Sequence, residues 1–225
     1  MPKHKGDYIL TSSRDEKIVR PAALLPKKYY VGNKIIVFPK DPVAGGSWIA
    51  YAENRTACLL NGGFVKHISK PPYKKSRGLV LLDYFSFDDL ESFNKHYDFK
   101  GIEPFTLVIV EQENLYELRW DEVKTTVTKL DAEQPHIWSS VTLYSEEIIA
   151  KRKIWFQSWL SLNKEYSKEA IVSFHRDGGD GDKTNDVLMN RENFLMTVSI
   201  TSIEKRIDTL EMLYDDLINN SLLMI

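Results

Sequence analysis

The chain has very little cysteine, no long apolar segment and almost no net charge. Cys58 is its only cysteine, so no disulfide can form within the chain, and such sparing use is typical of a reducing compartment. No uninterrupted apolar run approaches the roughly 20 residues of a membrane-spanning helix, and the first residues lack the apolar stretch of a signal peptide. The 30 basic and 32 acidic side chains leave a net charge of −2, which gives no electrostatic basis for broad binding of nucleic acid. We therefore expect a cytoplasmic protein with no transmembrane segment and no nucleic-acid partner.

Common metal and phosphate motifs are also missing. The five histidines show no paired spacing typical of metal ligands, so we predict no metal site and no cofactor. The segment "GGDGDKT", residues 178–184, fails as a phosphate-binding loop because Asp182 stands where that motif needs glycine and the preceding segment reads as a helix. It also lacks the spacing of a calcium-binding EF-hand, so we interpret it as a solvated or locally hydrogen-bonded loop. Cys58, between apolar neighbours in "TACLLN", is interpreted as a small buried side chain.

Core-forming residues, by contrast, are plentiful. Hydrophobic residues make up 43% of the chain and aromatic residues 12%, which is sufficient for a single large domain over residues 1–225, with two smaller domains as the alternative. A small molecule is the expected substrate or ligand, and self-association into a homo-oligomer stays open.

The apolar pattern indicates short strands arranged as successive hairpins, with helices grouped between them. Strands are predicted at residues 8–12 and in "KIIVFP", "SWIAYAE", "TACLLN", "PFTLVIVEQ", "LYELRW", "VKTTVTKL", "FLMTVSIT", "IEKRID" and "TLEMLY". Helices are predicted over 77–85 with Ser76 as cap, from Ser86 onward, over 145–163 with Ser145 as cap, and over 168–175. This order favours an α+β fold with antiparallel sheets over alternating βαβ units.

A group of three charged residues, Arg14, Asp15 and Glu16, follows the strand predicted to end at Ser12. Two readings of this group are open. Arg14 and Asp15 form a structural ion pair at the end of a strand, or the group lines a functional site.

Two glycine pairs, in "GGSW" (45–48) and "LLNGGF" (59–64), have similar alternatives. The first pair can simply form a turn that leads Trp48 into the core. Asn61 before the second pair can set a turn of its own, or its amide can serve a site.

Together, these three segments resemble the NRDE family, which includes the transport and Golgi organization proteins. The run 13–16 is similar to the Asn-Arg-Asp-Glu box of that family, with Ser13 in place of Asn. The "GGSW" turn resembles its Gly-Gly-Thr-Trp turn, and Asn61 ends a strand as in its members. The stretches "RPA", "IEPFTLVIV", "IWSSVTLYSEE" and "MTVSIT" look like the bacterial branch, so the resemblance covers nearly the whole chain.

That family is similar in turn to N-terminal-nucleophile hydrolases of the choloylglycine hydrolase and penicillin acylase type. The resemblance implies a four-layer αββα sandwich of two antiparallel sheets. It also implies hydrolysis of a non-peptide C–N amide bond in a small molecule by an N-terminal Cys whose own α-amino group is the base. Arg14 would then stabilise the thiolate and Asp15 would orient the amine. The amide of Asn61 or the N–H groups of Gly62 and Gly63 would receive the oxyanion.

The same resemblance implies further substrate contacts. Ser139 and Ser140 stand where the hydrolases have an Asn-rich motif, and Arg191 is similar to a late arginine on their substrate side. No metal takes part.

One departure concerns the start of the chain. Family members begin Met-Cys, whereas here Pro2 follows Met1, so the chain as written has no N-terminal nucleophile and is inactive. "PKHKGD" reads as a hairpin turn without an entering strand, so we hypothesise that Met1 is internal and that about half a dozen residues bearing the Cys belong before it. The single domain would then lack its first strand. The alternatives are a pseudoenzyme and a non-catalytic protein that binds or traffics haem or lipid through the same cleft.

Overall fold

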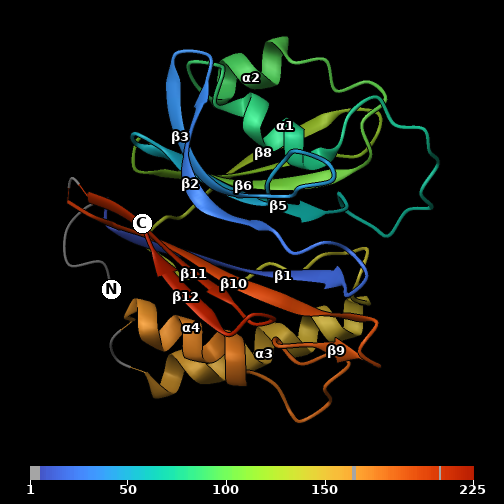
Figure 1. Cartoon of the computed structure of the whole chain (residues 1–225), viewed down its shortest axis with the longest axis vertical. Coiled ribbons are helices and arrows are strands. Elements are labelled where there is room, and N and C mark those ends of the chain that lie inside the picture. Colours follow the sequence, from blue (N-terminus) through green and yellow to red (C-terminus); the bar gives the residue numbers. More distant parts are fainter. Residues whose placement is uncertain (1–5, 164–165, 208) are drawn as a thin grey trace. The chain divides into compact units, whose positions relative to one another are not determined.

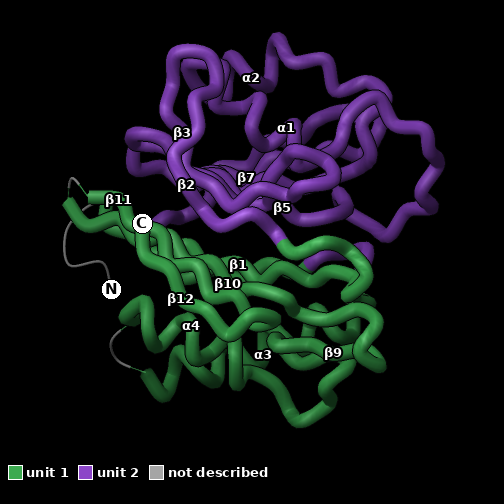
Figure 2. Tube along the Cα trace, in the orientation of Figure 1, with its two compact units in different colours: residues 1–22, 135–139, 144–225 green, residues 23–134, 140–143 purple. Residues whose placement is uncertain are grey.

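Two antiparallel β-sheets, each accompanied by two α-helices, make up the chain in the computed structural model (Figure 1). The structure describes residues 6–163, 166–207 and 209–225. The sheets belong to two compact units (Figure 2): unit 1 comprises Met1–Ala22, Pro135–Ser139 and Tyr144–Ile225, and unit 2 comprises Ala23–Gln134 and Ser140–Leu143. The predicted α+β class with antiparallel sheets is confirmed, and these are the elements of the predicted αββα sandwich.

Unit 1 is built on the sheet order β1-β10-β11-β12, with the short β9 paired to β10. Its strands are β1 (Tyr8–Lys17), β9 (Asn190–Arg191), β10 (Leu195–Arg206), β11 (Thr209–Asp216) and β12 (Ser221–Met224), and its helices are α3 (Glu146–Leu162) and α4 (Lys168–Asp177). Both helices lie on one face of this sheet (Figure 1), and α4 contacts β1 and β10.

Strand β1 continues to Lys17, so the prediction that it ends at Ser12 is wrong. The partner strand β10 supplies antiparallel pairing along the whole of β1, from Tyr8 opposite Lys205 to Lys17 opposite Leu195. The same long partner joins "FLMTVSIT" and "IEKRID", predicted as two strands, into one. Pairing with β10 therefore overrides the local signal that charged residues give for a strand end.

The helices of unit 1 follow the predictions closely at their N-termini. Ser145 accepts a hydrogen bond from the Ile148 N–H at 3.4 Å and caps α3. By helical spacing, Ile148, Trp155, Trp159 and Leu162 are expected to form an apolar stripe on α3. This is only partly confirmed, because Leu162 at its end is 82% exposed, whereas the buried residue of α3 is Arg152. Helix α4 starts at Lys168 as predicted and ends at Asp177, beyond the predicted position 175.

Polar contacts join β1 to its neighbours in unit 1. Thr11 Oγ1 lies 2.8 Å from Ser202 Oγ on β10. A hydrogen bond of 2.8 Å joins Ser13 Oγ on β1 to Nδ1 of His175 on α4. Strand β1 is thus tied by hydroxyl groups to both β10 and α4.

This placement of His175 makes the stability of the fold depend on pH. Burial, together with the nearby charge of Arg152, lowers the pKa of His175 from 6.5 to about 4. Between these two values the unfolded chain binds more protons than the folded one, so the stability present above pH 6.5 is lost as the pH falls toward 4. The full effect amounts to about 3 kcal/mol, since one pKa unit corresponds to about 1.4 kcal/mol.

Urea denaturation of the wild-type chain and His175→Gln across this pH range measures the effect. We expect the variant to lose the part of the pH dependence that centres between pH 4 and 6.5. If the free energy of unfolding changes with pH equally in both proteins, His175 is not the source of the pH dependence.

Unit 2 contains a sheet in which every strand pairs with its neighbour in sequence, in the order β2-β3-β4-β5-β6-β7-β8. The strands are β2 (Leu24–Val31), β3 (Lys34–Lys40), β4 (Ile49–Ala52), β5 (Arg55–Asn61), β6 (Phe105–Glu111), β7 (Asn114–Trp120) and β8 (Thr125–Leu130), and the helices are α1 (Arg77–Tyr84) and α2 (Leu90–His96). The predictions of β3 to β8 are confirmed. Strand β2 was not predicted because Pro26 reads as a break; as an edge strand it tolerates proline, and its register shifts between Leu24 and Lys27.

The hydrophobic core of unit 2 lies between α1, α2 and this sheet, and its largest buried side chains include Tyr84, Phe93 and Phe105. Helix α2 begins at Leu90 rather than at Ser86. Asp89 accepts the Ser92 N–H at 2.7 Å, and Glu111 on β6 accepts the Leu90 N–H at 3.1 Å. Helix α1 begins where predicted, but the side chain of its cap residue Ser76 makes no capping hydrogen bond.

Candidate active site around Asp15

Asp15 on β1 accepts a hydrogen bond on each of its two carboxylate oxygens. Its Oδ2 accepts a hydrogen bond from the Tyr144 hydroxyl at 2.7 Å, and its Oδ1 accepts one from Thr197 Oγ1 at 2.7 Å. A register shift between Arg14 and Asp15 puts Asp15 opposite Thr197, whereas Arg14 lies opposite Ser199. The irregularity in the ladder therefore brings the hydroxyl of Thr197 to the carboxylate.

Arg14 lies on the other side of this register shift. Its Nη2 lies 3.4 Å from Glu16 Oε2. Burial raises the pKa of Tyr214 on β11, and the charge of Arg14 is among the influences that lower it. The structure thus brings Arg14 to Glu16, and Asp15 to Tyr144 and Thr197.

Two arginines flank the ring of Tyr144, the residue before the cap of α3. The guanidinium carbon of Arg152 on α3 is 3.6 Å from the ring centroid, and that of Arg191 at the end of β9 is 5.4 Å from it. Such distances are typical of cation–π contacts. The hydroxyl of Tyr144 therefore reaches Asp15 from a ring that two positive charges border.

Burial is the largest influence on the Asp15 carboxyl, and the pKa of Asp15 is raised overall. Burial raises the pKa of Asp15, while the hydrogen bonds from Thr197 and Tyr144 and the charges of Arg152 and Arg191 lower it. Burial and the neighbouring carboxylate raise the pKa of Tyr144, so its hydroxyl stays protonated as a donor. A titratable residue perturbed by both burial and specific charges is a candidate for function.

Of these residues, sequence reasoning found Asp15 and Arg191 and missed Tyr144, Arg152 and Thr197. Arg152 carried a signal, because it lies at helical spacing within the apolar stripe of Ile148 and Trp155. A charged residue on the buried side of a helix needs partners, which marks it for attention. Tyr144 and Thr197 have no comparable local signal.

A second set of predicted residues comes together in unit 2. Asn61 ends β5, and its backbone carbonyl accepts a hydrogen bond from Ser140 Oγ at 2.8 Å. Gly62 has a φ of 92°, and an added Cβ would lie 2.5 Å from Val141 Cγ2. The Gly62 N–H donates to the Pro104 carbonyl at 3.0 Å. The Asn61 side chain and the Gly63 N–H are therefore the remaining donors for the predicted oxyanion contact.

Ser139 belongs to the short segment of unit 1 that precedes Ser140. The predicted convergence of Arg14 and Asp15 with Asn61 spans the two units and stays a prediction. The structure establishes two local groups: Asp15 with Arg191 in unit 1, and Asn61, Gly62, Gly63 and Ser140 in unit 2.

The "GGSW" segment forms the predicted turn. Gly45 has a φ of 74°, and the Ser47 hydroxyl donates to the carbonyl of Pro39 at 2.7 Å. Trp48 is 9% exposed and belongs to the core, which confirms the structural reading of this motif. Cys58, 5% exposed, is a buried side chain as predicted.

Within residues 6–163, 166–207 and 209–225, no group of three or more His, Cys, Asp or Glu side chains is arranged to hold a metal ion. In that same part of the chain no helix has the length and apolar character needed to cross a membrane.

A family model described as Transport and Golgi organisation 2 matches residues 2–205. The chain belongs to this family. A search of the curated proteins finds no match. The match to the Transport and Golgi organisation 2 family spans every predicted site residue from Arg14 to Arg191, which confirms the family assigned from the three sequence segments.

Proposed function

We propose that this protein is an N-terminal-nucleophile hydrolase that cleaves a non-peptide C–N amide bond of a small molecule. The observation that carries the proposal is the Asp15 carboxylate, which Tyr144 and Thr197 hold from two sides, each at 2.7 Å. A fixed carboxylate acceptor is what a free α-amino group needs when it serves as a base.

The reaction proceeds in two stages, acylation of the first residue and hydrolysis of the acyl group. The thiol or hydroxyl of the first residue gives its proton to the α-amine and attacks the amide carbon, so a C–S or C–O bond forms. The C–N bond then breaks, and the leaving nitrogen takes the proton from the amine. Water then gives a proton to the α-amine and attacks the acyl carbon. The C–S or C–O bond to the first residue breaks, the acid is released, and the amine returns the proton to the nucleophile.

Asp15 is suited to holding the amine through both stages. Each carboxylate oxygen has accepted one hydroxyl hydrogen bond and retains a lone pair for another donor. Because both existing donors are neutral, they fix the carboxylate without cancelling its charge. In the proposal the Asn61 amide and the Gly63 N–H receive the oxyanion, Arg14 favours the ionised nucleophile, and Ser139, Ser140 and Arg191 contact substrate.

The mechanism requires Cys, Ser or Thr as the first residue of the mature protein, and neither Met1 nor Pro2 is one. Residues 1–5 lie outside the described part of the chain, and with them most of the hairpin turn predicted over residues 2–7. The identity of the mature first residue is therefore a part of the test.

The experiment uses the protein purified from its native source, with its first residue read by mass spectrometry. It is incubated with a panel of N-acyl amino acids and other small amides, and released amines are quantified. Amine release, with an acyl adduct on the first residue, supports the proposal. Saturable binding of haem or lipid without amine release would replace it with the carrier function. The absence of both amine release and an acyl adduct for every amide tested would reject hydrolysis.

A further inference from the structure

Both arginines beside Tyr144 donate to the backbone of one loop, which connects α4 to β9. Arg152 Nε donates to the Asn185 carbonyl at 3.1 Å, and its Nη2 donates to the Asp186 carbonyl at 2.6 Å. Arg191 Nε donates to the Thr184 carbonyl at 3.0 Å. Three consecutive carbonyls thus receive the two guanidinium groups that border Tyr144.

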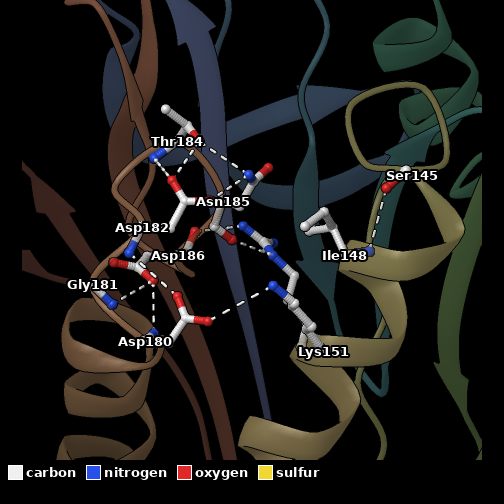
Figure 3. Close-up of polar contacts among 10 residues, drawn as sticks. Ser145, Ile148, Lys151, Asp180, Gly181, Asp182, Thr184, Asn185 and Asp186 are labelled. Atoms are coloured by element: carbon white, nitrogen blue, oxygen red, sulfur yellow. Dashed lines mark hydrogen bonds and ion pairs between the residues drawn. The ribbon is translucent and has the colours of Figure 1, made fainter.

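The side chains of the same loop hold those carbonyls in place (Figure 3). Asp182 Oδ1 accepts the Thr184 N–H at 3.0 Å, and its Oδ2 accepts the Asn185 side-chain amide at 2.7 Å. Asp186 Oδ1 accepts the Asp180 N–H at 3.0 Å. The prediction of a locally hydrogen-bonded loop is confirmed, and its bonds fix the carbonyls that the arginines use.

We propose that Asp182 and Arg152 are positioning residues for the Asp15 site, a role that rests on the function proposed above. Asp182 shapes the loop, the loop carbonyls orient Arg152 and Arg191, and the arginines hold Tyr144 with its hydroxyl on Asp15. The acidic loop then acts on the reaction only through Tyr144 and Asp15.

The hydrogen-bond acceptors of Arg152 distinguish its positioning role from that of a residue in an ordinary ion pair. Arg152 is only 7% exposed, and a buried guanidinium requires acceptors for its donors. Both hydrogen bonds that the structure gives it end on carbonyl oxygens, which are neutral. Its positive charge therefore remains available to its surroundings, and it lowers the pKa of both Asp15 and His175.

The test measures the Asp15 carboxyl directly, by ¹³C NMR titration of the native protein labelled at aspartate. In Asp182→Ala the carbonyls at 184–186 lose their support, so we expect the arginines to shift and the pKa of Asp15 to rise. In turnover assays, kcat should fall about 10- to 100-fold with little change in KM, because misplaced groups act on the chemical step.

Lys151→Ala is the matched control. Lys151 is the helical neighbour of Arg152, and its ammonium group lies 4.0 Å from Asp180 with both side chains exposed. Its removal should leave the pKa of Asp15 and the turnover unchanged. Arg152→Gln, whose amide can donate to the same carbonyls, should raise the pKa of Asp15 even if Asp182→Ala does not fold.

The outcomes separate this proposal from the function on which it rests. An Asp15 pKa that is the same in folded Asp182→Ala, in Arg152→Gln and in the wild type overturns the positioning role. If the wild-type protein releases no amine from any amide, the hydrolase function fails, whereas the titration still decides whether the loop controls Asp15.

Discussion

Asp15→Asn is expected to reduce hydrolysis by about 10³-fold, the scale of losing a positioned acid–base group. Asparagine has the same shape and can keep contacts with Tyr144 and Thr197, whose hydroxyls lie 2.7 Å from the two carboxylate oxygens. It lacks the negative charge that would hold the α-amine while the amine carries the proton of the nucleophile. The rate of amine release per active site measures this loss.

The same variant should be at least as stable as the wild type at pH 7. Burial raises the pKa of Asp15 above 3.8, so the folded chain binds the proton more tightly than the unfolded one. The free energy of unfolding therefore falls as the pH rises from the pKa of Asp15 in the unfolded chain to its raised pKa in the folded chain. An uncharged side chain avoids that loss. Functional sites often carry a stability cost of this kind.

Asp177→Asn, an exposed carboxylate at the end of α4, is the control for a change of one charge in the same unit. It should retain full activity. Wild-type turnover in Asp15→Asn would show that the carboxylate has no part in the reaction.

Gly46→Ala is expected to destabilise the fold by about 3 kcal/mol or more, the upper range for overpacking. An added Cβ would lie 2.3 Å from the Gly78 carbonyl carbon and 2.6 Å from the Leu79 nitrogen. These are backbone atoms at the start of α1, so no side-chain rotation can relieve the clash. Urea denaturation with far-ultraviolet circular dichroism gives the free energy of unfolding.

Gly45→Ala is the matched control at the preceding position. Its φ of 74° disfavours a side chain, yet nothing lies within 4 Å of the added Cβ. The expected cost is about 1 kcal/mol from the left-handed backbone alone. Equal losses for the two variants would mean that the close approach of Gly46 and Gly78 does not determine the packing of the "GGSW" turn on α1.

The sequence predicted elements well where the local pattern and the tertiary environment agree. The meander β6–β8 and the capped start of α3 are such cases, because their β-branched runs and the cap at Ser145 find matching partners in the fold. Strand β1 past Ser12 was missed because it depends on pairing with β10, far away in the sequence. Strand β2 was missed because Pro26 reads as a break, although β2 pairs with β3 directly after it. Local signals for a turn or a break cannot anticipate that pairing.

The candidate site divides in the same way. Asp15 and Arg191 belong to segments that resemble a known family, so the sequence drew attention to them. Tyr144 and Thr197 are far from Asp15 in sequence. A contact made by a single hydroxyl group produces no periodic pattern in the sequence by which it could be predicted. The role of the "GGDGDKTND" loop was hidden for another reason: the arginines donate to its backbone carbonyls, which any sequence carries.

The most direct measurement of the central claim is intact-protein mass spectrometry of the native protein and Asp15→Asn after incubation with an activated acyl ester. The account predicts an acyl adduct on the first residue of the wild type, formed about 10³-fold more slowly in the variant. An adduct formed equally fast in both proteins, or none at the first residue of the wild type, would contradict it.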